Sequence, residues 1–216
     1  MLFNLHTHHL PSEQECSIQN VHENFESILP NFYYSLGIHP WHIQPEQYSA
    51  EFEKLKIHSL KKNVLSIGEC GLDRKCTTPF KLQEEVFKQQ ILWANNIAKP
   101  LIIHCVKAHA ECCQQLKDNN NIMPIIFHGF HSQWEIAHTL LQKGYYLSFG
   151  KSLFDQKMEK VFAAVPLERI FLETDNSNHS IFEVYMQAAA IRRISIDQLH
   201  SQIQKNVQFI FNITLP

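Results

Sequence analysis

The sequence predicts an α/β protein of the (β/α)8, or TIM-barrel, class, formed by a single domain that spans residues 1–216. Three observations lead to this prediction. Short apolar runs typical of strands alternate with segments of helical periodicity along the whole chain. No linker or change of composition divides the chain, and 216 residues suffice for one well-buried domain but hardly for two.

The apolar runs predict eight strands, near residues 2–6, 16–21, 33–38, 64–69, 100–105, 124–129, 145–149 and 170–174. The runs Leu101–Ile103 and Pro124–Phe127 are apolar throughout, as are strands of a parallel sheet that is covered on both faces. Residues 9–32 leave no room for a full helix between the first two strands, and only for a short one between the second and third. We therefore expect a barrel with truncated helices between its first strands.

Helix signals appear between the later strands. Thr78-Pro79 predicts an N-cap with proline at the first helical position. The spacings Ser132-x-x-Glu135 and Ser195-x-x-Gln198 each predict a capping box, and Gly144 is expected to end the helix that follows the first of them.

Charge and cysteine content restrict the function classes. The net charge of −2 gives no basic field that could hold a long duplex by counterion release. The six cysteines form no Cys-x-x-Cys pair, and neither a secretory signal nor an apolar run of membrane-spanning length is seen. We therefore expect reduced, structural thiols and a soluble cytoplasmic protein, with no membrane or protein partner implied.

The segment His6-Thr7-His8 closes the first predicted strand. Because residues i and i+2 of an extended chain point the same way, both imidazoles can reach one ion. Alone this pattern is a weak signal in a chain with 14 histidines. It gains weight because polar, metal-binding residue types also follow or end other predicted strands: Glu69, His104, His128 and Asp175.

The carboxyl ends of barrel strands lie on one face, where such enzymes place their catalytic residues. Four imidazoles and two carboxylates gathered there would be costly without cations. Six ligands exceed the need of one catalytic ion with an open position, so they predict two divalent ions with one bridging carboxylate. The mixed ligand set does not select between Mg, Mn and Zn.

Taken in order, the motifs of the chain resemble the TatD family of metal-dependent hydrolases, among the amidohydrolase-like barrels, over nearly the whole length. The resemblance rests on His6-Thr7-His8, Gly37-Ile38-His39-Pro40, Ile67-Gly68-Glu69-Cys70-Gly71-Leu72-Asp73, Ile103-His104-Cys105, Phe127-His128-Gly129-Phe130 and Leu172-Glu173-Thr174-Asp175. It implies His6, His8 and Asp175 on one metal, His104 and His128 on the other, and Glu69 between them. It further implies Asp175 as the general base and His39 near the substrate phosphate. Family members are Mg- or Mn-dependent deoxyribonucleases, some acting from the 3′ end of single strands, and others are linked to aminoacyl-tRNA deacylation.

The sequence departs from the family pattern in substrate-facing parts. Asn4 stands where the family usually has Asp, and Val106 replaces a common Arg. The segment Asn176-Ser177-Asn178-His179 replaces the usual Ala-Pro-Tyr-Leu after Asp175, and the chain is shorter than typical members. The resemblance therefore supports hydrolase activity more firmly than DNase activity.

These observations predict a metal-dependent hydrolase with Asp175 and Glu69 as catalytic residues, cleaving a phosphodiester at the end of single-stranded DNA. His39, Arg74 and Lys107 follow the third, fourth and fifth predicted strands and are candidates to bind the substrate phosphate. Trp41, beside His39, is a candidate to stack on a terminal base. Two alternatives stay open: hydrolysis of another ester (a small phosphoester, a lactone or an aminoacyl ester), or a metal-binding scaffold without catalysis.

Overall fold

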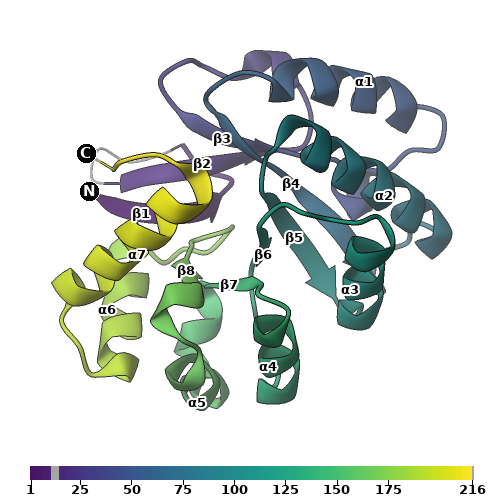
Figure 1. Ribbon diagram of the computed structural model, residues 1–216. Coiled ribbons are helices and arrows are strands. Elements are labelled where there is room, and N and C mark those ends of the chain that lie inside the picture. The colour runs from purple at the N-terminus through teal and green to yellow at the C-terminus, as the bar shows by residue number, and fades with distance from the viewer. Residues whose placement is uncertain (11–14, 216) are drawn as a thin grey trace. The chain divides into compact units, whose positions relative to one another are not determined.

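The computed structural model describes residues 1–10 and 15–215. Eight parallel strands follow one another in the sheet in chain order and alternate with α-helices from β3 onward, which confirms the predicted fold class (Figure 1). The strands are β1 (Leu2–Thr7), β2 (Glu15–Val21), β3 (Tyr33–Leu36), β4 (Val64–Asp73), β5 (Leu101–Val106), β6 (Ile125–Phe127), β7 (Tyr146–Phe149) and β8 (Ile170–Leu172). The α-helices are α1 (Tyr48–Ser59), α2 (Phe80–Ile97), α3 (His109–Asp118), α4 (Trp134–Gln142), α5 (Gln156–Ala164), α6 (Ile181–Arg192) and α7 (Ile196–Phe211).

The first strands lack full helices, as predicted. The described residues between β1 and β2 form no helix, and between β2 and β3 there is only the 3-10 turn η1 (Phe25–Ser27). Short 3-10 turns also occur at η2 (Pro40–His42), η3 (Lys151–Phe154) and η4 (Leu167–Arg169). None of the described helices is long and apolar enough to cross a membrane.

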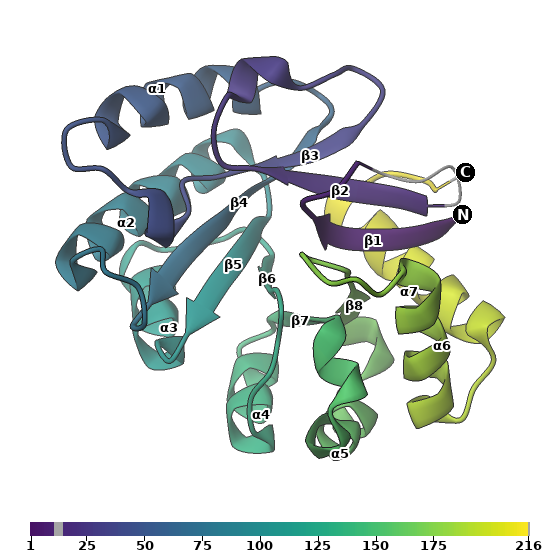
Figure 2. The same cartoon turned by 180° about the vertical axis from the view of Figure 1, so that it is seen from behind.

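The chain divides into two compact units, here called the terminal unit (Met1–Gln19 with Ile126–Pro216) and the central unit (Asn20–Ile125). In the terminal unit β6, β7 and β8 pair in parallel, and β1 joins β8 through a bridge between Thr7 and Asp175. Helices α6 and α7 pack on each other and on β1 (Figures 1 and 2). The core of this unit includes the rings of Phe3, Phe171 and Phe211, whose centroids lie 6.0–6.3 Å apart.

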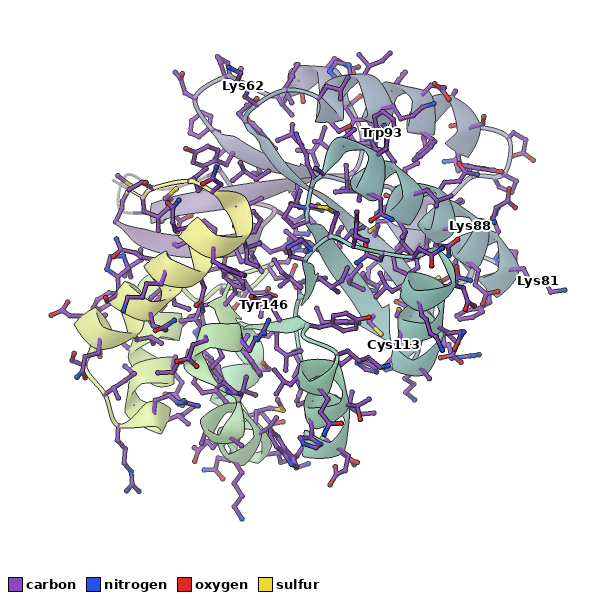
Figure 3. The ribbon with its side chains drawn as sticks, viewed as in Figure 1. Lys62, Lys81, Lys88, Trp93, Cys113 and Tyr146 are labelled. Carbon is purple, nitrogen blue, oxygen red and sulfur yellow. The ribbon has the colours of Figure 1, made fainter. Side chains whose placement is uncertain are left out.

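In the central unit β4 pairs with β3 on one side and β5 on the other, and all ten of its residues are buried. Helix α2 covers β4 with a stripe of buried residues at helical spacing that includes two glutamines. The indole of Trp93 on α2, which is labelled in Figure 3, donates a hydrogen bond to Ser59 on α1 at 2.9 Å and so links the two helices.

The predicted helix ends are confirmed in part. Ser195-x-x-Gln198 forms a capping box, and Gly144 follows the end of α4 with a φ of 80° that glycine adopts readily. The capping box at Ser132-x-x-Glu135 is wrong, because α4 begins one residue later, after Gln133, without a side-chain cap. The prediction for Thr78-Pro79 is also shifted: Pro79 is itself the N-cap residue and the helix begins at Phe80.

Candidate metal sites

Each unit holds one group of three potential metal ligands whose donor atoms all lie within 4.8 Å of one another. We call His6, His8 and Asp175 the terminal set, and His39, Glu69 and His104 the central set. A metal ion lies about 2.0–2.3 Å from each ligand atom, so the ligand atoms around one ion lie as close to one another as the donor atoms of these sets do. Imidazole suits Zn, and carboxylate suits Mg or Mn, so both mixed sets fit a divalent cation.

The terminal set is positioned by backbone contacts between β1 and the segment after β8. His6 lies in β1 and His8 just beyond it, and the Asp175 N–H donates to the His6 carbonyl at 2.9 Å. Asp175 adopts a φ of 52°, in the left-handed region that Asp tolerates better than most residues. Its Oδ1 lies 3.5 Å from Nε2 of His8 and 3.8 Å from Nε2 of His6. His6 is buried, whereas the His8 and Asp175 side chains are 22% and 23% exposed, so one side of this set is open to solvent.

His128 belongs to the same unit and follows β6. Its ring centroid lies 4.3 Å from that of His6, and its Nδ1 lies 3.4 Å from Oε1 of the buried Glu173. The Gly129 N–H donates to the same oxygen at 2.7 Å. Burial opposes ionisation of Glu173, but the hydrogen bond and charge of His128 lower the pKa of this carboxyl below its usual range. A carboxylate that orients an imidazole in this way is typical of metal-site surroundings. Sequence reasoning missed Glu173, although a glutamate directly after the apolar run Ile170–Leu172 is a usable signal.

The central set is held together by side-chain contacts. Oε1 of Glu69 lies 2.7 Å from Nδ1 of His104 and accepts a hydrogen bond from Nε2 of His39 at 3.1 Å. The other nitrogen of His39 accepts a hydrogen bond from the backbone N–H of Trp41, so the proton of a neutral His39 ring lies on Nε2. Burial lowers the pKa of His39 to about 4 although Glu69 raises it, so the neutral ring prevails near pH 7.

Glu69 lies inside β4 and His104 inside β5, because these strands continue to Asp73 and Val106. The prediction that the two residues close their strands is therefore wrong by a few residues. The β4–β5 pairing shifts register between Ile67 and Cys70, next to Glu69, and irregular pairing of this kind is frequent beside active sites. The flanking glycine Gly68 is required there, since its φ is 149° and a Cβ would run into the Ile102 carbonyl.

Buried polar side chains of the central unit fix the backbone around this set. Asn20 Oδ1 accepts the Glu69 N–H at 2.7 Å. The amide of Gln90 bonds both to the N–H and to the carbonyl of Ile38, the residue before His39. Neither Asn20 nor Gln90 was predicted from the sequence. The signal that could have identified Gln90 is its position on the apolar face of α2.

Asp73, at the end of β4, contacts the other nitrogen of His104. Its Oδ2 lies 3.0 Å from Nε2 of His104 and accepts the indole N–H of Trp41 at 2.6 Å. Burial raises the pKa of Asp73, but the hydrogen bonds from Trp41 and His104 outweigh it and lower the pKa below its usual range. Sequence reasoning quoted Asp73 within a motif but gave it no role.

The predicted phosphate-binding residues lie in different settings. His39 is part of the central set, with both ring nitrogens engaged. Arg74 forms an ion pair with Glu111 and lies over the ring of Phe80 at 4.3 Å. Lys107 is exposed just after β5, with a φ of 52°. The structure therefore places His39 with Glu69 and His104, and gives Arg74 a partner on α3.

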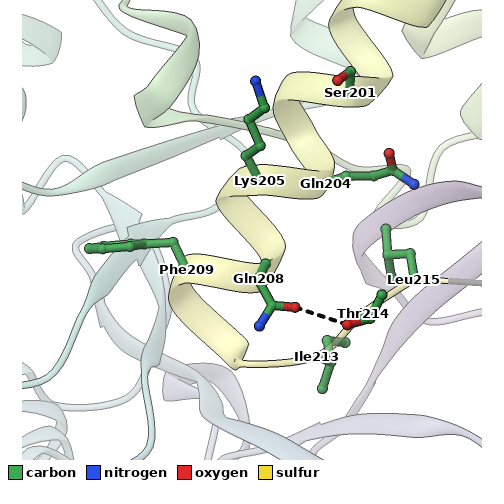
Figure 4. Close-up of a pocket in the computed structure, with 8 residues that line it drawn as sticks. All are labelled: Ser201, Gln204, Lys205, Gln208, Phe209, Ile213, Thr214 and Leu215. Carbon is green, nitrogen blue, oxygen red and sulfur yellow. Dashed lines mark hydrogen bonds between the residues drawn. The ribbon is translucent and has the colours of Figure 1, made fainter.

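A pocket of about 590 Å³ lies elsewhere, along the C-terminal end of α7 (Figure 4). It is lined by Lys205, Phe209 and Leu215 among others, and none of its lining residues is His, Cys, Asp or Glu. This pocket therefore offers neither metal ligands nor a catalytic carboxylate. No disulfide joins any of the six cysteines; Cys70 and Cys112 are buried, and the other four are partly exposed.

The comparisons with known proteins agree with the donor chemistry. Residues 7–212 match the family described as TatD related DNase. An uncharacterized metal-dependent hydrolase of Buchnera aphidicola subsp. Baizongia pistaciae is 30% identical, over 88% of this chain and 80% of that protein. The uncharacterized metal-dependent hydrolase YjjV of Escherichia coli is 25% identical, over 88% of this chain and 83% of that protein.

Solved structures confirm the fold. The crystal structure of YjjV, a TatD homologue from E. coli, superposes with a TM-score of 0.78 at 23% identity, covering 91% of this chain and 86% of that one. A TatD family hydrolase from Entamoeba histolytica gives a TM-score of 0.79 at 17% identity, covering 90% and 84% of the two chains. With the family match over nearly its whole length, this chain belongs to the TatD family of metal-dependent hydrolases.

Proposed function

We propose that this metal-dependent hydrolase cleaves phosphodiesters at the end of a single-stranded nucleic acid, as a TatD-like deoxyribonuclease. The observation that carries the proposal is the terminal set, in which a partly exposed carboxylate lies beside two imidazoles. The description of the matching family as TatD related DNase supports a nucleic acid as the substrate.

The proposed cofactors are two divalent ions, Mg, Mn or Zn. His6, His8 and Asp175 would hold one ion, His104 and His128 the other, and Glu69 would be shared. The grouping of His6, His8 and Asp175 in the terminal set supports the first of these assignments. Bound divalent ions lower the pKa of water and neutralise phosphoryl oxygens, which are the two requirements of phosphodiester hydrolysis near neutral pH.

Asp175 is the proposed general base. Its carboxylate is partly exposed, so it can accept a proton from the attacking water and pass it to the leaving oxygen. The backbone hydrogen bond from Asp175 to His6 holds it in place during this exchange. The proposed role of Glu69 is ligation, since its Oε1 already faces two imidazoles.

His39, Arg74 and Lys107 remain the proposed contacts to the substrate phosphate, with unequal contributions. Both nitrogens of His39 are engaged, and Arg74 is paired with Glu111. The exposed Lys107 therefore has the least to give up on binding a phosphate. With a net charge of −2 the chain can neutralise few phosphates, which favours a strand end over a long duplex.

The test is digestion of end-labelled single-stranded and duplex DNA with Mg²⁺, Mn²⁺ or Zn²⁺, beside a Glu69→Ala variant. We expect mononucleotides released stepwise from one end of the single strand, and no product from the variant. A panel of small phosphoesters, lactones and aminoacyl esters is run in parallel. Turnover of one of these without DNA cleavage would replace the proposed substrate, and absence of any turnover with every metal would favour a scaffold.

A further inference from the structure

The side chain of Trp41 is 59% exposed, yet it is held from several directions within the central unit. Its N–H donates to Oδ2 of Asp73 at 2.6 Å. Its ring stands edge-on to His39, at 5.1 Å and 89°, and to His104, at 5.9 Å and 78°. An exposed indole is not in itself unusual, but one bonded to a buried carboxylate presents its surface in a fixed orientation.

Asp73 is fixed independently of Trp41 and His104. The carboxylate is 1% exposed, and its Oδ1 accepts the backbone N–H of Lys75 at 2.6 Å. Its backbone N–H donates to Oε1 of Gln83 at 2.8 Å, and its carbonyl accepts from the amide of the same side chain at 3.1 Å. The second carboxylate oxygen is thus left at a defined position, where it meets Trp41 and His104 together.

We propose that Trp41 is a stacking platform for a planar base of the substrate, and that Asp73 is the residue that positions this platform relative to His104. The inference rests on the proposed function, because it names the part of a nucleic acid that Trp41 would contact. Stacking on an aromatic side chain suits every base, since each has a π face. With Nε2 of His104 turned to Asp73, its Nδ1 faces Glu69. A carboxylate on the far nitrogen of a ligating imidazole orients the ring in this way.

The platform is tested by calorimetric titration, in Mg²⁺, with deoxyadenosine monophosphate and with 2-deoxyribose 5-phosphate, which lacks the base. Loss of one stacking contact corresponds to roughly a 5- to 100-fold loss of affinity. We expect Trp41→Ala to weaken nucleotide binding by this factor and leave sugar-phosphate binding unchanged, with Trp41→Phe in between. Trp134→Phe, on α4 in the other unit, is the matched control and should bind both ligands as the wild type does. A wild type that binds the nucleotide no more tightly than the sugar phosphate overturns the platform, as does equal weakening of both ligands by Trp41→Ala.

The positioning role of Asp73 has a spectroscopic test. The indole N–H resonance of Trp41 is assigned by its loss in Trp41→Phe, and should shift upfield in Asp73→Asn because the charged acceptor is gone. The preference for nucleotide over sugar phosphate should fall in the same variant. An unchanged resonance together with unchanged preference would contradict the role. If Asp73→Asn does not fold, Trp41→Phe removes the same hydrogen bond from the other partner, and full retention of the preference in that variant would contradict it instead.

The two proposals can fail separately. DNA cleavage that proceeds normally in Trp41→Ala, with unchanged nucleotide binding, overturns the platform and leaves the nuclease. Trp41-dependent nucleotide binding in a protein that cleaves no DNA supports the platform and overturns the proposed reaction.

Discussion

The terminal and central sets use the same ligand types but are held in different ways. In the central set one oxygen of Glu69 lies 2.7 Å and 3.1 Å from two imidazole nitrogens, and all three side chains are largely buried. In the terminal set Asp175 lies 3.5 Å and 3.8 Å from its imidazoles, at or beyond the limit of a hydrogen bond, and is 23% exposed.

The side chains of the central set are held by hydrogen bonds among themselves, whereas those of the terminal set are positioned by backbone contacts. The contacts of Glu69 to His39 and His104 stabilise the central set before any ion binds. Asp175 is placed by its bridge to β1 and its N–H bond to His6, and its carboxylate stays accessible to water. We infer that Glu69 combines ligation with a structural role, and that Asp175 is the better placed of the two to move a proton.

The largest expected effect tests this division directly. Asp175→Asn should lower kcat by about 10²–10⁴-fold, the contribution of a general base, and leave the melting temperature nearly unchanged. Glu69→Gln should also lower kcat by several orders of magnitude, but in addition it disturbs the hydrogen bonds with His39 and His104 and should cost ~1–3 kcal/mol of stability.

Three properties are measured for both variants: activity on the substrate that the digestion test identifies, bound metal and thermal unfolding. His138→Asn, which changes an exposed histidine on α4, is the control and should match the wild type in all three. Near-normal kcat with full metal content in Glu69→Gln would remove Glu69 from the site. A melting temperature that falls equally in both variants would erase the contrast between the sets.

A second prediction concerns acid stability of the metal-free protein. Burial lowers the pKa of His39 from 6.5 to about 4 in the folded chain. Between these values the unfolded chain binds a proton that the folded chain does not, so stability falls as the pH falls from 6.5 to about 4. At about 1.4 kcal/mol for each pKa unit the loss reaches ~3 kcal/mol. Above pH 6.5 His39 makes no such contribution, since both states are neutral.

His39→Asn should remove this part of the pH dependence, because asparagine does not titrate and can still cap the turn at Pro40–His42. Urea unfolding with chelator present, at pH 7 and pH 4.5, measures the difference. The His138→Asn control should keep the wild-type dependence. If His39→Asn loses as much stability on acidification as the wild type does, the acid-sensitive group lies elsewhere.

The difference between the sets also explains what the sequence could predict. Strand periodicity and the spacing of His6 and His8 are local properties, so the fold class and the pairing of those two histidines on one side were predictable. The side chains that contact the candidate ligands could not be predicted. Asp73 and Glu173 meet His104 and His128 through contacts 31 and 45 residues apart in sequence, which periodicity does not encode. The same holds for Gln90: its sequence context is that of an ordinary helical residue, and only the structure shows that its amide bonds to the backbone of Ile38, next to His39.

The smallest expected effect concerns the backbone that carries the terminal set. Asn4 in β1 and Thr174 after β8 bond to each other twice: Nδ2 donates to Oγ1 at 2.8 Å, and the Thr174 N–H donates to Oδ1 at 3.0 Å. Both side chains are buried, so Asn4→Ala leaves polar groups without partners and should cost ~1–3 kcal/mol in urea unfolding. Asn4→Asp keeps the shape of the side chain and is the conservative counterpart. Its carboxylate can accept from the N–H and from the rotatable hydroxyl of Thr174, so near-wild-type stability is expected at pH 7.

If both variants are equally unstable, the charge at this position is not tolerated, and the asparagine is required by the buried contact to Thr174. If neither is destabilised, β1 and the segment after β8 are joined mainly by the backbone bonds at Thr7 and Asp175, and the terminal set owes its geometry to those alone.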